Sequence, residues 1–196
     1  MFNDSLDLKD EKMLAEIPGP ILVIGVSGFI GVNLFAALKK RRKDVFGLSK
    51  NKKDNWRILG LKKEFPELTS CESPSLFHCD ISQMNELKKV IHHLRPQTIF
   101  NLAAYGTSEG ESDWESIQSV NYFGLLNLLK LSEEYPVKAF VNTGSSSEYG
   151  KNCAGPLESD ELIANSDYSL SKIAGSFAVS YFGAIKKIPC NHLRLY

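Results

Sequence analysis

The sequence has no excess charge of either sign and no long hydrophobic run. Lys+Arg and Asp+Glu number 23 each, so the 196-residue chain has no net field to attract nucleic acid or an anionic membrane. No apolar stretch reaches the length of a membrane span, and the polar, acidic residues 1–20 lack the pattern of a signal peptide. The sequence therefore predicts a cytoplasmic protein with no nucleic acid and no membrane among its partners.

Cysteine is also scarce and carries no metal-site pattern. The four cysteines are Cys71, Cys79, Cys153 and Cys190, and their spacing is wide and irregular. There is no C-x-x-C pair and no set of histidines at metal-ligand intervals. We expect four reduced thiols and no bound metal.

The stretch from Ile21 to Gly31 organises the rest of the chain. A short apolar run ends in Gly25, Gly28 and Gly31 and passes into an amphipathic helix. Glycines at such a strand-to-helix turn let the backbone approach a pyrophosphate, and the helix N-terminus offers unpaired N–H groups to the anion. The spacing is G-x-x-G-x-x-G rather than the commonest G-x-G-x-x-G, so a turn without a ligand stays open at this point.

Apolar runs and helical periodicities alternate along the chain without an internal repeat. A helix over about residues 6–17 ends at Pro18 and makes residues 1–20 a helical extension. The expected strands cover 21–25, 44–48, 75–79, 98–102, 138–142 and 189–196, and the expected helices cover 29–38, 83–94, 114–134 and a segment from 166. This order predicts an α/β fold, a doubly wound parallel sheet of the Rossmann type with helices on both faces, over residues 21–196.

A basic run, residues 39–43, closes the first helix after the glycines. Cations at a helix C-terminus complement the helix dipole and face water. A nucleic-acid patch is the alternative, and nothing else in the sequence supports it.

The end of the second strand bears on the choice of cofactor. In dinucleotide-binding folds an acidic residue at this place binds the ribose 2′-hydroxyl, whereas a basic one accommodates a 2′-phosphate. The sequence has Ser49 and Lys50 here, with Lys52, Lys53 and Arg57 close by. This favours NADP over NAD, and a solvated basic loop that binds no phosphate is the alternative explanation of these residues.

Tyr168 and Lys172 are four residues apart on an expected helix, so both project from one face. A neighbouring ammonium stabilises a phenolate, and we therefore expect Lys172 to lower the pKa of Tyr168. The serines that follow the fifth strand, Ser145 to Ser147, offer a hydroxyl to hold a substrate oxygen. All these groups are expected at the carboxyl edge of the sheet, beside the glycine loop. A solvent-facing helix pair is the alternative for the tyrosine and lysine alone.

Together these patterns resemble the extended short-chain dehydrogenase/reductases, in particular their nucleotide-sugar epimerase/dehydratase branch. The motifs that carry the resemblance are Gly25-x-x-Gly28-Phe-Ile-Gly31, Cys79-Asp80-Ile81, Asn101-Leu-Ala-Ala104, Asn121, Ser145-Ser-Ser-Glu-Tyr-Gly150 and Tyr168-x-x-x-Lys172. They cover nearly the whole chain after residue 20.

The resemblance implies a role for each matching residue. Tyr168 is the acid–base residue, Ser145 orients the substrate, Lys172 also binds the nicotinamide ribose, and Asn121 supports the helix and a water network near the lysine. Asp80 meets the adenine. The implied cofactor-binding set is Gly25, Ser27, Gly28, Phe29, Ile30, Gly31, Ser49, Lys50, Asp80, Ile81, Leu102, Ala103, Ala104, Tyr168 and Lys172.

Two departures from the family pattern shape the functional hypothesis. The sugar 4,6-dehydratases carry an acidic residue where this chain has Ser146 and Ser147, and Glu148 is shifted, so a dehydratase is disfavoured. The family's chains also continue into a sugar-binding lobe, whereas this sequence ends at Tyr196 and is interpreted as C-terminally truncated. The leading hypothesis is an NAD(P)-dependent keto-sugar reductase or C4 epimerase acting on a nucleotide sugar. A non-catalytic NAD(P)-binding module or an inactive fragment is the competing one.

The helices over 114–134 and 166–185 carry more apolar positions than one sheet-facing stripe requires. In the resembled family such helices pair in a four-helix interface. We therefore expect a homodimer. The positions concerned are Leu125, Leu126, Leu128 and Leu129 on one helix and Ile173, Phe177, Tyr181 and Phe182 on the other.

Overall fold

The fold was determined as a computed structural model that describes residues 8–51, 53–69, 75–107, 112–152 and 154–196. Its centre is a six-stranded parallel sheet in the order β3-β2-β1-β4-β5-β6. The strands are β1 (Ile21–Ile24), β2 (Val45–Ser49), β3 (Leu76–His78), β4 (Thr98–Asn101), β5 (Ala139–Ser145) and β6 (Cys190–Leu195). The expected parallel sheet is confirmed.

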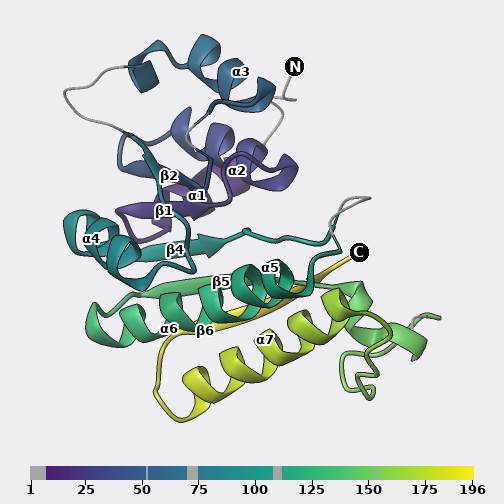
Figure 1. The fold of residues 1–196 in the computed structure, drawn as a ribbon. Coiled ribbons are helices and arrows are strands. Elements are labelled where there is room, and N and C mark those ends of the chain that lie inside the picture. Colours follow the sequence, from purple (N-terminus) through teal and green to yellow (C-terminus); the bar gives the residue numbers. More distant parts are fainter. Residues whose placement is uncertain (1–7, 52, 70–74, 108–111, 153) are drawn as a thin grey trace.

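Helices connect successive strands and cover the sheet (Figure 1). They are α1 (Leu8–Glu16), α2 (Phe29–Lys39), α3 (Trp56–Glu64), α4 (Met84–Leu94), α5 (Trp114–Gln118), α6 (Leu125–Glu134) and α7 (Asp167–Ala184). Shorter helical segments are the 3-10 segments η1 (Pro66–Thr69) and η3 (Ser146–Asn152), the latter kinked at Gly150, and the π-helical segment η2 (Ser119–Gly124). No helix in the described ranges is both long enough and apolar enough to cross a membrane.

Strand β1 shows why two layers of helices are needed. Its four residues are all fully buried, because alternate side chains face opposite sides of the sheet. Ile21 and Val23 pack with α2 and α3 in one core, whereas Leu22 and Ile24 pack with α4, α6 and α7 in the other. The expectation of helices on both faces is therefore confirmed.

The helix expected over 114–134 is not a regular α-helix. It consists of α5, the π-helical turn η2 and α6. A π turn adds one residue to the helical repeat and rotates the residues that follow. Asn121 is buried here, and a Cβ on Gly124 would lie 2.6 Å from Ile81 Cγ1, so the turn sits closely against the segment after β3.

The basic run that ends α2 is bound into the fold rather than fully solvated. Arg42 pairs with Asp44 at 2.8 Å and also donates to the carbonyl oxygen of Ile17, just after α1. Lys39 donates to the hydroxyl of Ser75 at 3.1 Å. The expectation of a water-facing run is thus wrong for these two cations, because the run anchors neighbouring segments.

Two of the four cysteines, Cys71 and Cys153, lie outside the described residues. Cys79 and Cys190 are free thiols. Burial raises the pKa of Cys79 to about 11, so this thiol stays protonated near neutral pH. No cluster of metal-ligating side chains occurs within the described part of the chain.

Candidate functional site

The glycine loop joins β1 to α2 and leaves no space for a side chain at Gly25 or Gly31. Gly25 has φ +81°, and a Cβ there would lie 2.8 Å from the backbone nitrogen of Ala103 after β4. A Cβ on Gly31 would collide with the carbonyl oxygen of Gly25. The close approach of β1, β4 and α2 therefore depends on these glycines, as the motif predicts.

A cavity of about 370 Å³ lies beside this loop at the carboxyl ends of the strands. Nine residues of the predicted cofactor set line it: Gly25, Ser27, Gly28, Lys50, Asp80, Ile81, Leu102, Ala103 and Ala104. Its wall also includes Cys79 of the Cys79-Asp80-Ile81 motif, together with Ile24, Leu48, Asn51, Tyr105 and Val120, which the motifs do not mark. A cavity edged by glycine backbone, a helix N-terminus and small side chains fits a dinucleotide.

Six other residues of the predicted cofactor set do not line the cavity: Phe29, Ile30, Gly31, Ser49, Tyr168 and Lys172. The side chains of Phe29 and Ile30 are 72% and 48% exposed on the outside of α2, so only their backbone N–H groups face a ligand at the helix start. Gly31 packs against Gly25. Ser49 is buried, and its hydroxyl bonds to the carbonyl of Asn51 and to a ring nitrogen of His78. A direct contact between the Ser49 hydroxyl and a ribose is therefore not supported.

Lys50 and Asp80 form an ion pair across the mouth of the cavity. Lys50 Nζ lies 2.9 Å from Asp80 Oδ2, and Asp80 Oδ1 accepts hydrogen bonds from the backbone and hydroxyl of Ser82. Burial alone would raise the pKa of Asp80, but the hydrogen bonds from Lys50 and Ser82 lower it below its usual value. Asp80 is thus a fixed carboxylate at the place where the sequence predicts adenosine.

Lys172 and Tyr168 lie at the start of α7 with Ser145 beside them. Lys172 Nζ donates to the carbonyl of Thr143 at 3.0 Å and lies 5.7 Å from the centre of the Tyr168 ring. Burial lowers the pKa of Lys172 to about 8. The sequence brings the three groups together as predicted.

The predicted direction of the Tyr168 pKa is wrong for the chain as it stands. Burial raises this pKa, and the negative charge of Glu148 raises it further, while a hydrogen bond with Ser145 lowers it. The ammonium of Lys172 is directed to the Thr143 carbonyl, so it does not offset the cost of a buried phenolate.

Asn121 connects the two halves of the site. Its amide bonds to both backbone groups of Tyr105, at 2.9 Å each, and donates to Ser171 Oγ at 3.0 Å. Tyr105 lines the cavity and Ser171 precedes Lys172. Asn121 is therefore connected to Lys172 only through the adjacent residue Ser171. Gly106, at φ +90°, lets the chain pass Tyr168 closely, because a Cβ there would be 3.3 Å from the Tyr168 ring.

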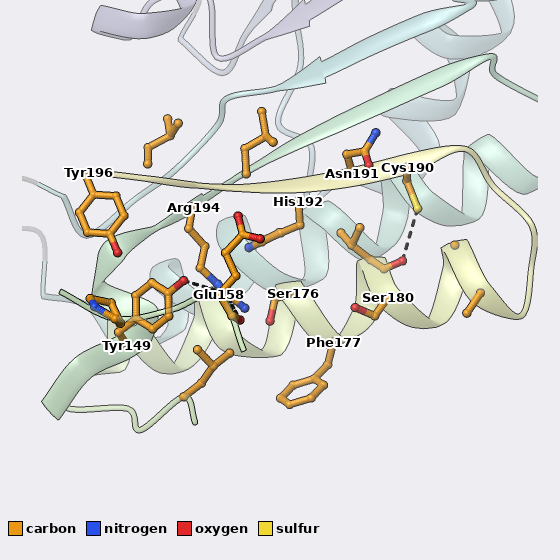
Figure 2. A pocket seen from close by; sticks show the side chains of 17 residues that line it. Tyr149, Glu158, Ser176, Phe177, Ser180, Cys190, Asn191, His192, Arg194 and Tyr196 are labelled. Carbon is orange, nitrogen blue, oxygen red and sulfur yellow. Dashed lines mark hydrogen bonds between the residues drawn. The ribbon is translucent and has the colours of Figure 1, made fainter. Parts of the chain in front are cut away.

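Beneath Ser145 lies a charged cluster that the motifs did not reveal. Glu148 is fully buried; His192 Nε2 lies 2.8 Å from its Oε1, and Arg194 Nε donates to its Oε2 at 3.0 Å. Arg194 also donates to the hydroxyl of Tyr149, in a groove of about 1010 Å³ between β6 and α7 (Figure 2). The contacts arise because β6 pairs with β5, and no local spacing in the sequence signals them.

Residues 21–196 match the model of the NAD dependent epimerase/dehydratase family. The chain belongs to this family. The match starts at β1 and includes the glycine loop, the cavity and the Tyr168–Lys172 pair, so it confirms the resemblance to the extended short-chain dehydrogenase/reductases.

Two curated members of the family illustrate its range. The chain is 28% identical over 180 residues to UDP-glucuronate 4-epimerase 2 of Arabidopsis thaliana, and the aligned region covers 90% of this chain and 41% of the relative. It is 29% identical over 121 residues to mitochondrial L-threonine 3-dehydrogenase of Sus scrofa, covering 62% of this chain and 30% of the relative. The chain thus spans less than half the length of these family members.

A solved family structure has the same fold. The epimerase Mth375 of Methanothermobacter thermautotrophicus superposes with a TM-score of 0.77 at 26% identity, over 94% of this chain and 53% of that one. The superposition confirms the Rossmann-type architecture of this NAD dependent epimerase/dehydratase family member.

Proposed function

We propose that this family member binds a nicotinamide dinucleotide at the glycine loop and serves in NAD(P)-dependent oxidoreduction of a nucleotide sugar. The reaction is reduction of a keto-sugar or epimerisation at C4. One observation carries the proposal: the cavity beside Gly25 and the Ser145, Tyr168 and Lys172 group lie at the same carboxyl edge of one parallel sheet. Ligands of open α/β sheets bind at that edge.

The side chains divide the work of such a reaction between them. The nicotinamide, when bound, supplies hydride exchange with the sugar carbon. The Tyr168 hydroxyl gives its proton to the sugar oxygen in reduction and takes it back in oxidation. The Ser145 hydroxyl holds that oxygen. Lys172 carries its charge in a place that is only 5% exposed, 5.7 Å from the centre of the Tyr168 ring, and its proposed role is to bind the nicotinamide ribose.

The proposed cofactor is NADP, with NAD as the alternative. None of the four residues directly after β2 is acidic, and the exposed ammonium of Lys50 stands at the cavity mouth. A 2′-phosphate there gains a cation that already has Asp80 as its partner, so it has to compete with that carboxylate. The description of the family as NAD dependent keeps the alternative open.

The nucleotide-sugar substrate is supported by the relative named UDP-glucuronate 4-epimerase, and the threonine dehydrogenases make a small hydroxy amino acid the second candidate. A 4,6-dehydratase stays disfavoured, because the Glu148 carboxylate is fully buried and held by His192 and Arg194. A carboxylate buried in this way does not reach a sugar carbon in the cavity.

Fluorescence titration and turnover assays test the proposal together. We expect NADPH to bind more tightly than NADH, and UDP-glucuronate or a UDP-4-keto-sugar to be converted. Tyr168→Phe should lower the rate of conversion at least about a hundredfold, because it removes the proton that is transferred. Cofactor binding should persist in this variant. Tyr181→Phe, on the exposed side of α7, is the matched control and should retain activity.

Other outcomes separate the alternatives. Cofactor binding without conversion of any sugar or of L-threonine favours the non-catalytic module. Failure of both NADPH and NADH to bind at micromolar concentration contradicts the enzyme and the binding module alike.

A further inference from the structure

A hydrogen-bonded row of side chains crosses three strands and ends at Ser145. Asn101 on β4 donates to Asn142 on β5 at 2.7 Å, and the Asn142 amide nitrogen lies 3.0 Å from His192 Nδ1 on β6. His192 Nε2 meets Glu148 Oε1 at 2.8 Å, and the same carboxylate oxygen accepts the backbone N–H of Ser145 at 2.8 Å. The row thus runs from the middle of the sheet to the backbone of Ser145, the serine that is proposed to hold the substrate oxygen.

The chemistry of the groups sets the direction of the bonds. An ionised carboxylate only accepts hydrogen bonds, so the Nε2 proton of His192 points to Glu148. The Asn142 amide oxygen already accepts from Asn101, so its amide nitrogen is the donor toward His192 Nδ1. The row needs Gly144 on β5, because a Cβ there would collide with Glu148 Oε1 and His192 Nε2. The sheet therefore leaves a space that the carboxylate and imidazole fill.

We propose that Glu148 is a positioning residue: its carboxylate, held by His192 and Arg194, fixes the backbone at Ser145 and places a negative charge behind the Tyr168 and Lys172 pair. This rests on the proposed function of those three residues. The Ser145-Ser-Ser-Glu-Tyr-Gly150 motif contains Glu148 but the resemblance gives it no role, since the acidic residue of the dehydratases stands earlier in the segment.

The charge of Glu148 reaches both members of the pair. It raises the pKa of Tyr168 and also raises that of Lys172, in the latter case against the stronger effect of burial. A carboxylate thus keeps the phenol protonated and the amine charged. That combination suits a residue that has to donate a proton to a sugar oxygen.

A purely structural role does not require a charge. Any oxygen acceptor would satisfy the Ser145 N–H, and a fully buried carboxylate costs several kcal/mol of desolvation that His192 and Arg194 have to offset. Glu148→Gln therefore separates the two roles, because glutamine keeps the size and an oxygen but removes the charge.

Tyrosine ring NMR on the full chain measures the effect directly. With ¹³Cζ-labelled tyrosine, the Tyr168 signal is the one missing from Tyr168→Phe. We expect Glu148→Gln to lower the titration midpoint of Tyr168 by about one unit, as loss of a nearby like charge does. Glu86→Gln, exposed on α4, is the matched control and should leave the midpoint unchanged.

Five other titratable or charged groups lie around Glu148 in the described part of the chain. They are His192 and Arg194 on β6, Tyr149 in η3, and Tyr168 with Lys172 on α7. Lys172 titrates near the range of interest, so the comparison is repeated in a Lys172→Met background. The same downward shift is expected there.

A variant of opposite sign covers the case in which Glu148→Gln does not fold. Arg194 is partly exposed, and Arg194→Gln leaves the carboxylate less neutralised, so the Tyr168 midpoint should rise. No shift in either variant, or shifts of the same sign, overturns the proposal. Because no substrate is needed, a correct pair of shifts without turnover rejects only the proposed function, and turnover without shifts rejects only the role of Glu148.

Discussion

Lys172 holds an ammonium group in a place where it is only 5% exposed. Its ammonium donates to the Thr143 carbonyl, and burial lowers its pKa from 10.5 to about 8. The folded chain therefore releases this proton above about pH 8, whereas the unfolded chain keeps it to about pH 10.5. Between these values the unfolded state binds more protons, so this group makes folding more favourable as the pH rises.

The prediction concerns the difference between the protein and Lys172→Met. Relative to that variant, the free energy of unfolding of the unchanged chain should rise by up to about 3 kcal/mol between pH 8 and 10.5. Urea unfolding of both proteins at steps of pH measures it, and all groups that do not interact with Lys172 cancel in the difference. A difference that stays flat or falls with pH contradicts a buried, charged Lys172.

At the residue scale the sequence predicts which side chains form the candidate site better than it predicts the burial and charges around them. The four-residue spacing of Tyr168 and Lys172 places both on one helix face, whatever surrounds them. The direction of the Tyr168 pKa depends on burial and on Glu148, which the spacing does not contain. Glu148 and His192 are 44 residues apart and meet only because β5 and β6 pair. The burial of Ser49 could not be predicted either, because its hydroxyl contacts His78 on the neighbouring strand β3.

At the scale of elements, the N-terminus of α3 is coupled to the glycine loop. The side chain of Asn55 accepts hydrogen bonds from the backbones of Arg57 and Ile58 and so caps α3. Its amide also donates to the carbonyl of Ser27 at 2.9 Å. One side chain thus ends a helix and fixes the loop that is proposed to hold the pyrophosphate.

Asn55→Ala is expected to weaken two properties at once. Loss of the cap should lower stability by about 1 kcal/mol, and release of Ser27 should weaken binding of NADPH several-fold. Asp113→Ala removes another N-cap, that of α5, at an exposed place outside the cavity. Thermal unfolding and fluorescence titration of both variants measure the effects. Equal cofactor affinities in the two variants would show that the loop does not depend on Asn55.

Strands and most helices are predictable at this scale, whereas the π turn is not. Buried runs such as Ile21–Ile24 and helical periodicities such as that of α4 lie within one or two residues of the expected ranges. The turn over Ser119–Gly124 differs from an α-helix only in which carbonyl each N–H selects. Its composition carries no sign of that choice, although it sets the place of Asn121.

At the scale of the whole molecule, α6 and α7 keep an apolar outer side. Phe177 and Tyr181 are 66% and 49% exposed, and a groove of about 600 Å³ runs beside them towards Tyr122 and Leu126. Five of the residues from which the sequence predicts a dimer, Leu125, Leu128, Leu129, Ile173 and Phe182, instead complete the core of the chain. The exposed remainder still forms one continuous surface, and we propose that two copies pair through it.

The final prediction tests this pairing. In a two-fold interface each substitution is present in both copies, so Phe177→Glu places two carboxylates in one apolar contact. The cost of burying these charges should dissociate the dimer. Light scattering should give twice 21.9 kDa for the unchanged chain and 21.9 kDa for the variant. Trp56→Glu alters a residue of α3 that is 72% exposed, away from both helices, and should leave the mass unchanged. A monomeric mass for the unchanged chain rejects the pairing, and because the site groups lie within one chain, the proposed chemistry would stand without it.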